Sequence, residues 1–376
     1  MKRRNDATYV ADLDPYKRIF PYIMKRRNDS LVYHQFKIDL TRGVQFIKDM
    51  NHQNPGDHQY RVFELFLAAM MRTFAMRPQL NRFLANYEIW QRNELSLNFV
   101  VKEDYSDEAP EHSSIVYFQP EMTFPEMASI INRTIENARN GGTDNDSDRA
   151  IDFFLHFPKW FIRMFVLLAG WLDWHGIAPK ALRDADGLHA TAFVANLGSI
   201  GLEGSPHHHL YQWGTTSVFV TMGTMRRRRV INENNQRSFI DQMDIGVTLD
   251  ERIADGFYFI KTIQILQDYL DHPERLLERP ELPAPPLTIR EVKAKKLAAK
   301  KKAKLDLKDL REKEEKSILG LEPTSALPRT DQDPDLSEDI PHRRASSSRL
   351  TALYRRKSSH RGSGSRRLRR HSDTLS

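Results

Sequence analysis

The sequence predicts a mixed α+β domain with a charged extension behind it. Apolar residues recur at the helical period between residues 62 and 74, and short runs of β-forming residues recur along the chain. A proline cluster at residues 280–286 then ends the domain, because prolines cannot continue a preceding helix. With 376 residues and 40% hydrophobic content, the chain can bury a full core.

The elements follow in order along the domain. Residues 1–14 are polar and predict a mobile N-terminus, and the helix at 62–74 is expected to cover a sheet. The turn-rich loop at 140–148 predicts an apolar helix beginning near Ile151, and the apolar stretch at 165–172 predicts a buried helix. Strands are predicted at residues 95–101, 114–118, 189–196, 216–222 and 245–249.

The positive charge is concentrated in the last quarter of the chain. Residues 290–376 hold 24 Lys and Arg against 13 Asp and Glu, which leaves 33 against 37 for the preceding residues. Cysteine is absent, which excludes disulfides and thiolate metal sites. The charged N-terminus leads into no apolar run, so a secretory signal is not expected and a cytoplasmic location is predicted.

The extension divides into two parts. Residues 287–318 are rich in Lys, Ala, Leu and Glu and predict a solvated helical linker, whereas 319–376 have the composition of a basic disordered tail. Three Arg-Arg-Xaa-Ser sequences end at Ser346, Ser358 and Ser372, where a phosphate would change the local charge by about −1.5 to −2 each. The tail is expected to bind anionic lipid, nucleic acid or an acidic protein, with a merely solvated extension as the alternative.

Residues 244–277 read as a buried strand, a tight turn and an amphipathic helix. The turn reads Glu251-Arg-Ile-Ala-Asp255-Gly256 and resembles the His-Xaa-Xaa-Xaa-Asp-Gly motif of CoA-dependent acyltransferases, the family of chloramphenicol acetyltransferase and the 2-oxo-acid dehydrogenase acyltransferase core. Asp255 and Gly256 match that motif, and Glu251 stands where the family has histidine. Residues 189–201 are similar to the strand and turn that carry the family's oxyanion-stabilising hydroxyl, but Ala195 occupies that place.

The resemblance covers residues 15–280 and implies a two-layer α+β sandwich at 15–286 that forms a homotrimer with active sites between subunits. It implies acyl-CoA as substrate, with Asn196 and Gly198 and the segment carrying Trp213 and Thr215 near the CoA channel. It also places Lys17 or Arg18 where a basic residue pairs with Asp255. The other interpretation of Trp213 is an ordinary core residue, and that of Asp255 a simple turn aspartate.

Glu251 in place of histidine and Ala195 in place of the hydroxyl residue leave two hypotheses about function. Histidine suits proton abstraction at neutral pH, whereas a glutamate carboxyl ordinarily titrates near about 4.3 and is a weaker base. Asp250 would add like-charge repulsion to Glu251, although strand alternation predicts that the two side chains face opposite ways. The sequence thus predicts either CoA-dependent acyl transfer with Glu251 as the base, or an inactive trimeric acyl-CoA-binding or scaffold protein.

The triplet His207-His208-His209 forms the one histidine cluster of the sequence. It follows a Gly-Ser-Pro loop, so His208 or His209 is a candidate for a displaced base. Neighbouring histidines in a loop diverge and rarely chelate together, and no metal is expected.

Overall fold

The computed structural model describes residues 4–56, 58–102, 111–139, 156–184, 186–231 and 235–318. The chain divides into two compact units, Met1–Asp309 and Leu310–Ser376. Of the second unit the structure describes residues 310–318, the end of helix α9 (Ile289–Ile318), which is the helix predicted for the linker. The predicted tail at 319–376, with its three Arg-Arg-Xaa-Ser sequences, lies outside the described residues.

The first unit is built on a mixed sheet with the strand order β2-β10-β8-β7-β5-β6, and β9 pairs with β10. β7 runs parallel to both of its neighbours, β5 and β8, whereas the other pairs in the sheet are antiparallel. The strands are β2 (Leu31–Asp39), β5 (Leu95–Lys102), β6 (Glu111–Phe118), β7 (Ala192–Asn196), β8 (Val218–Met222), β9 (Arg226–Ile231) and β10 (Arg237–Asp250).

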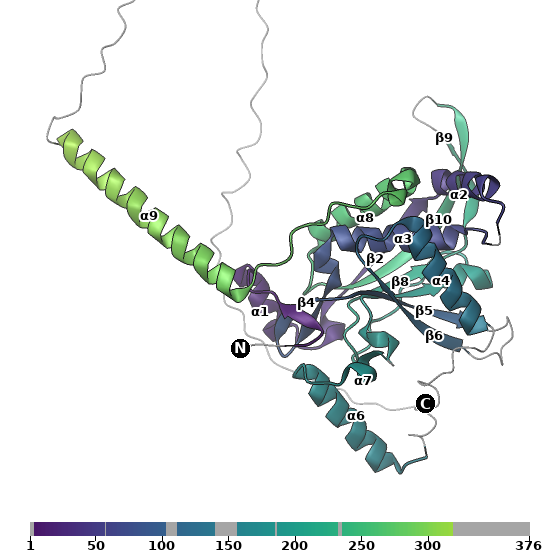
Figure 1. Ribbon diagram of the computed structural model, residues 1–376, viewed down its shortest axis with the longest axis horizontal. Coiled ribbons are helices and arrows are strands. Elements are labelled where there is room, and N and C mark those ends of the chain that lie inside the picture. Colours follow the sequence, from purple (N-terminus) through teal and green to yellow (C-terminus); the bar gives the residue numbers. More distant parts are fainter. Residues whose placement is uncertain are drawn as a thin grey trace, which may run out of the picture. The chain divides into compact units, whose positions relative to one another are not determined.

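Four helices lie together on one face of this sheet (Figure 1): α2 (Thr41–Gln53), α3 (Val62–Met76), α4 (Phe124–Arg139) and α8 (Gly256–Asp271). α3 is buried without interruption from Glu64 to Phe74, which confirms the helix predicted from the apolar period. The largest core cluster joins these helices to the sheet through side chains such as Phe66, Phe99 and Phe259. Burial of this apolar surface is the main stabilising contribution to the unit.

A small antiparallel sheet follows the order β1-β4-β3, from β1 (Ala7–Tyr9), β4 (Glu88–Arg92) and β3 (Arg82–Ala85). The N-terminal residues therefore differ from the mobile segment predicted for 1–14: Ala7 pairs with Arg92, and the Arg4 side chain is buried. The reason is an ion pair between Arg4 and the distant Asp173, which no local pattern signals. Helix α1 (Pro15–Ile23) follows this strand.

Helix α6 (Lys159–Trp174) contains the apolar stretch at 165–172, but the predicted burial is wrong, because Leu167 and Leu168 are exposed and only Ala169 is fully buried. The predicted start of a helix near Ile151 lies outside the described residues. Short helices complete the unit: α7 (Lys180–Asp184) and 3-10 turns at Arg27–Ser30, Pro78–Asn81, Gly187–His189, Leu197–Ile200 and Pro273–Leu277. Within the described ranges, no helix is both long and apolar enough to cross a membrane.

The predicted strands at 95–101, 114–118 and 245–249 are confirmed, and the last belongs to the much longer β10. The strand predicted at 189–196 begins later, because His189 ends a 3-10 turn. β8 likewise begins at Val218 rather than at residue 216. Both differences move polar residues from strands into the loops at one end of the sheet.

Candidate active site

Glu251 lies at an end of the central sheet where several strands start or finish. β10 ends at Asp250, which pairs with Leu31 at the start of β2. The backbone N–H of Glu251 donates to the carbonyl of Ser30 at 2.8 Å, and that of Asp250 donates to the carbonyl of Ser217 at 3.0 Å. These bonds hold the backbone of Glu251 beside the segment that leads into β8.

The side chains of Asp250 and Glu251 face opposite ways, as strand alternation predicts. The Asp250 carboxylate is fully buried and accepts from Nε and Nη2 of Arg252 at 2.8 and 2.6 Å. Arg252 also donates to the carbonyl of Met24 at 2.9 Å. Glu251 is exposed, and among the residues that the structure describes its carboxylate has no side-chain partner. The negative charge of Asp250 is therefore already neutralised by Arg252.

Asp255 fixes the turn that follows Glu251. It caps helix α8 by accepting from the backbone N–H of Tyr258 at 2.8 Å, which satisfies one of the free donors of the first helical turn. Its other oxygen accepts from Nζ of Lys17 at 2.9 Å, which confirms the predicted pairing with a basic residue of the first helix. The hydrogen bond from Lys17 and the helix N-terminus lower the pKa of Asp255.

Arg27 holds the loop that carries Trp213 and Thr215. Its buried guanidinium donates to the carbonyls of Tyr211, Gly214 and Thr216 at 2.8, 3.0 and 3.0 Å. These bonds satisfy the loop carbonyls in the interior. Burial lowers the pKa of Arg27.

Gly214 is required at the centre of this loop. Its φ of +77° is one that L residues rarely adopt, and a Cβ there would lie 2.3 Å from the carbonyl oxygen of Leu188. The close approach lets the backbone N–H of Thr215 and Thr216 both donate to that oxygen at 2.8 Å. The loop is therefore fixed against the 3-10 turn that ends at His189.

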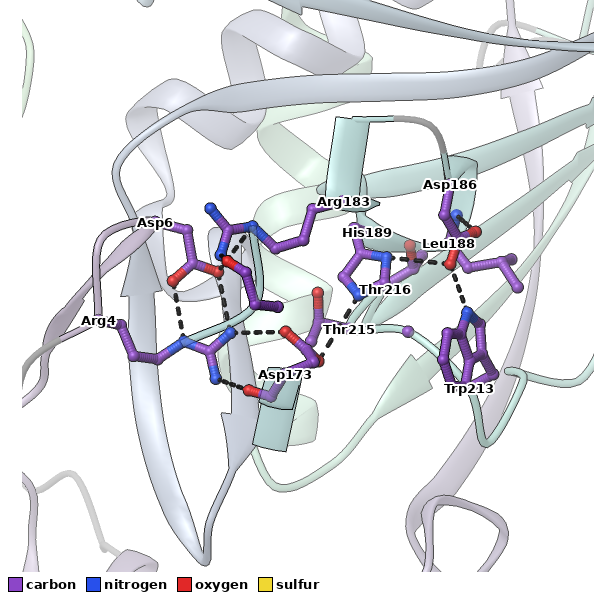
Figure 2. A network of polar contacts seen from close by, with 12 residues as sticks. Arg4, Asp6, Asp173, Arg183, Asp186, Leu188, His189, Trp213, Thr215 and Thr216 are labelled. Atoms are coloured by element: carbon purple, nitrogen blue, oxygen red, sulfur yellow. Dashed lines mark hydrogen bonds and ion pairs between the residues drawn. The ribbon is translucent and has the colours of Figure 1, made fainter. Parts of the chain in front are cut away.

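His189 is the centre of a buried polar network beside this loop (Figure 2). Its Nδ1 lies 3.1 Å from Asp186 Oδ2 and its Nε2 lies 3.6 Å from Asp173 Oδ2. Neither contact is aligned as a hydrogen bond, so both are mainly ionic. Burial alone would lower the pKa of His189, but the two carboxylates outweigh it and raise that pKa.

Two arginines extend the network to the N-terminal strand. Arg4 donates to Asp6 and to Asp173 at 2.9 Å, and Nε of Arg183 lies 3.8 Å from Asp6 (Figure 2). Burial raises the pKa of Asp173, but His189 and Arg4 together lower it to about 2. With both ring nitrogens of His189 facing carboxylates, the protonated form of the imidazole is stabilised, which suits a structural cation better than a general base.

Trp213 and Thr215 both belong to this region. Nε1 of Trp213 donates to Asp186, and Oγ1 of Thr215 accepts from Arg92 at 2.9 Å. Both line a cavity of about 130 Å³, whose other lining residues include Lys25, Arg27, His189 and Arg252. Basic side chains that are distant in sequence thus line this small cavity together with Asp173 and apolar residues, at the same end of the sheet as Glu251.

Asn196 and Gly198 lie at the opposite end of the strands. Ala192 pairs with Val218 at the start of β8 and Asn196 with Met222 at its end, so the two ends are about 13 Å apart. The side chain of Asn196 accepts from the backbone N–H of Ser199 at 3.2 Å. A Cβ at Gly198 would lie 2.3 Å from the carbonyl oxygen of Gly223, so this turn packs directly on the backbone after β8.

Ala195 pairs with Thr221 near that same end and carries no hydroxyl. Within one chain, the predicted CoA-binding residues therefore form two groups. Trp213 and Thr215 lie at the end of the sheet that holds Glu251, whereas Asn196 and Gly198 lie at the other. One chain does not bring all of them together.

His208 and His209 form an aromatic stack. The His208 ring lies 4.1 Å from that of Phe219 and 4.7 Å from that of His209, and its Nδ1 lies 2.7 Å from the His209 carbonyl oxygen. Phe219 pairs with Thr248, three residues before Glu251, which is about 10 Å along the strand. No group of three metal-ligating side chains occurs in the described part of the chain.

Sequence reasoning missed His189, Asp173 and Arg27. One signal was present, since His189 begins the segment 189–201 that carries the second resemblance. Asp173 was an isolated carboxylate in an apolar helix, which ordinarily indicates a paired or functional group. Arg27 stood in a polar stretch without any pattern that distinguishes it from its neighbours.

Comparisons with known proteins find similar solved structures. A probable dihydrolipoamide acetyltransferase from Listeria monocytogenes matches at 15% identity and a TM-score of 0.46, covering 69% of this chain and 93% of the other. A dihydrolipoamide acetyltransferase from Azotobacter vinelandii matches at 12% and 0.48, covering 71% and 93%. A chloramphenicol acetyltransferase matches at 12% and 0.43, covering 72% and 100%. No family model and no curated protein matches the sequence.

These structures belong to the classes of protein that the sequence resembles. At such identities and TM-scores the likeness does not by itself carry a functional argument.

Proposed function

We propose that the chain is a CoA-dependent acyltransferase-like protein, a two-layer sandwich in which Glu251 occupies the position of the catalytic base. The observation that carries the proposal is the turn after β10. Lys17 and the N-terminus of α8 hold Asp255, and the buried pair of Asp250 and Arg252 holds the strand end. Glu251 is left exposed between these two fixed points, where a substrate can reach it.

The reaction would pass an acyl group from the thioester of acyl-CoA to an acceptor hydroxyl, amine or thiol. Glu251 would take the acceptor's proton as the new bond to the acyl carbon forms, and the CoA thiolate would leave. The cavity lined by Lys25, Arg27 and Arg252 lies at the same sheet end. Lys25 and Arg27 in its lining would attract the anionic CoA.

The separation of Glu251 from Asn196 and Gly198 supports a homotrimer as part of this proposal. Within one chain, Asn196 and Gly198 at the end of β7 lie away from Glu251. A second copy whose Asn196 and Gly198 face the first copy's Glu251 would bring the two groups of predicted residues together. Closed cyclic symmetry would repeat that arrangement at each interface.

The test measures CoA thiol release by the purified chain across a panel of acyl-CoA thioesters and nucleophilic acceptors. The chain contains no cysteine, so a thiol reagent reports the released CoA without background from the protein. Glu251→Gln should abolish release, whereas Glu278→Gln, at another exposed glutamate, should keep it. Equal release by the Glu251→Gln variant and the unchanged chain would contradict the role of Glu251.

A second candidate is a non-catalytic protein that binds acyl-CoA or serves as a scaffold. Two observations favour it: the Glu251 carboxylate lacks an orienting partner in the described chain, and Ala195 supplies no oxyanion donor. One such donor is typically worth about 100- to 1000-fold in rate. Binding of acyl-CoA in calorimetry without thiol release would support this candidate, and turnover that depends on Glu251 would exclude it.

A further inference from the structure

Helix α6 presents an apolar stripe to solvent. Trp160, Met164, Leu167, Leu168 and Trp171 are 67%, 50%, 65%, 52% and 54% exposed. Their spacing of three and four residues places them along one face of the helix. These five residues are called the α6 stripe. Two tryptophans and three aliphatic side chains exposed along one helix face make the stripe a candidate interaction surface.

The other side of α6 explains why the stripe cannot turn inward. Ala169 is buried, and Gly170 lies so close to Trp213 that a Cβ would stand 3.3 Å from the ring. Asp173 points to the network and pairs with Arg4 and His189. The inner face is thus held by specific contacts, and the stripe remains on the outside.

The charges on α6 favour an anionic counter-surface. Lys159 begins the helix and Arg163 follows one turn later, both are exposed, and neither has an ion-pair partner in the described ranges. Cations at a helix N-terminus oppose the helix dipole, so they do not stabilise the helix itself. The only carboxylate of the helix, Asp173, faces inward. The outer surface of α6 therefore combines apolar side chains with two cationic side chains beside Trp160 that have no ion-pair partner among the described residues.

We propose that the α6 stripe binds the surface of a bilayer that contains anionic phospholipid. The helix would lie parallel to the surface, with Leu167, Leu168 and the indole rings of the two tryptophans reaching the acyl region. Lys159 and Arg163 would contact headgroup phosphates. With 16 residues, α6 is shorter than the roughly 20 that span a bilayer, so it would bind without crossing.

The size of the stripe favours a lipid surface over a second copy of the chain. A helix of 16 residues is about 24 Å long and about 10 Å wide, which gives a face of roughly 240 Å². A stable protein interface buries about 800 Å² on each partner. The stripe alone is therefore too small for a stable protein interface. A helix that lies in the surface of a bilayer needs only one apolar face of its own length.

The experiment uses the full chain and vesicles of phosphatidylcholine with phosphatidylglycerol, with and without brominated acyl chains. Bromine quenches only tryptophans that reach the acyl region, and the chain's 5 tryptophans all precede residue 214. Attachment through the basic extension alone would therefore leave the emission unquenched. We expect quenching in the unchanged chain, and its loss in a Trp160→Phe, Trp171→Phe variant that still binds.

Binding itself is measured by vesicle flotation. Leu167→Glu with Leu168→Glu should weaken binding about tenfold or more, because both side chains would lose their apolar surroundings. Ile231→Glu, at a residue that is 68% exposed in β9, should bind like the unchanged chain. Lys159→Glu with Arg163→Glu should weaken binding to anionic vesicles and leave binding to pure phosphatidylcholine unchanged.

Three results would overturn the proposal. These are vesicle binding without quenching, equal binding by the Leu167→Glu, Leu168→Glu variant, and no vesicle binding by the unchanged chain. If that same variant instead dissociates an oligomer in sedimentation velocity, the stripe is an interface between copies. Thiol release measured without vesicles should be unaffected by these variants, which separates this inference from the proposed acyl transfer.

Discussion

Nε2 of His189 lies 3.6 Å from Oδ2 of Asp173, and this buried contact links the loops at one end of the sheet to helix α6. Asp173 in turn binds Arg4, so the contact also reaches the N-terminal strand. Because both groups are ionised, the stability of the first unit should depend on pH from two directions.

Above neutrality the stability should fall as His189 loses its proton. The pKa of His189 is raised by Asp173 and Asp186, so its stabilising contribution is complete below about pH 6.5, the unfolded value, and disappears as pH rises through the raised folded value. Urea unfolding between pH 5.5 and 8.5 measures this. His189→Gln should remove that part of the slope, and His272→Gln, at an exposed histidine, should keep it. Equal slopes for His189→Gln and the unchanged chain would refute the ionic role of His189.

On the acid side the stability should fall as Asp173 is protonated. Its pKa is about 2 in the folded chain against an ordinary 3.8, so its contribution of about 2 kcal/mol is present above pH 3.8 and lost as pH falls through 2. Asp173→Asn should be less stable than the unchanged chain at pH 6, and the difference should shrink by about 2 kcal/mol towards pH 2. A difference that stays constant across this range would contradict the assignment.

Replacing Arg27 should destabilise the chain far more than replacing its neighbour. Arg27→Met leaves the carbonyls of Tyr211, Gly214 and Thr216 without these donors, and we expect a loss of about 3 kcal/mol or more. Arg26→Met, at an exposed side chain, should change the free energy of unfolding by about 0.5 kcal/mol or less. Denaturant unfolding measures both. Similar losses for the two variants would mean that the loop does not depend on Arg27.

Two substitutions at Asp255 separate the cap from the ion pair. Asn still accepts from the N–H of Tyr258 but loses the charge that pairs with Lys17, whereas Ala loses both. The partly exposed pair is worth less than about 1 kcal/mol, and the cap about 1 kcal/mol. Thermal unfolding should therefore rank the unchanged chain above Asp255→Asn and that above Asp255→Ala. If both variants unfold at one temperature, the side chain of Asp255 does not cap α8.

Gly204 and Gly214 offer a matched pair, with φ of +78° and +77°. A Cβ at Gly204 would have nothing within 4 Å, whereas at Gly214 it would meet the carbonyl oxygen of Leu188 at 2.3 Å. Gly204→Ala should cost about 1 kcal/mol from backbone conformation, and Gly214→Ala at least about 3 kcal/mol because backbone must also move. Equal costs in denaturant unfolding would show that the loop relaxes around Gly214.

The parts of the fold that the sequence predicts are those with a local signal. The helix at 62–74 and the strand-turn-helix around Glu251 follow from apolar periods and a turn motif, and the pairing of Lys17 with Asp255 followed from the resemblance. The sequence could not predict that the N-terminal residues are ordered, because their position depends on the contact of Arg4 with Asp173, 169 residues further along the chain.

One further failure has a physical reason. The apolar composition of α6 predicted burial, but composition does not distinguish a core helix from a helix with an exposed apolar face. For Asn196 and Gly198, spacing along the sequence does not show which end of a strand a residue occupies, and the register of β7 with β8 places them at the end away from Glu251 within one chain. The catalytic and CoA-binding roles of these residues remain predictions.

The bond between Arg4 and Asp173 sets an order of events during synthesis. At roughly 5–20 residues per second, Arg4 leaves the ribosome on the order of ten to thirty seconds before its partner exists. The first strand can pair with β4 earlier, but the charge of Arg4 finds Asp173 only when most of the first unit has been made. An interrupted chain that ends before residue 173 would therefore carry an incomplete charge cluster near its N-terminus, which would distinguish it from a finished molecule.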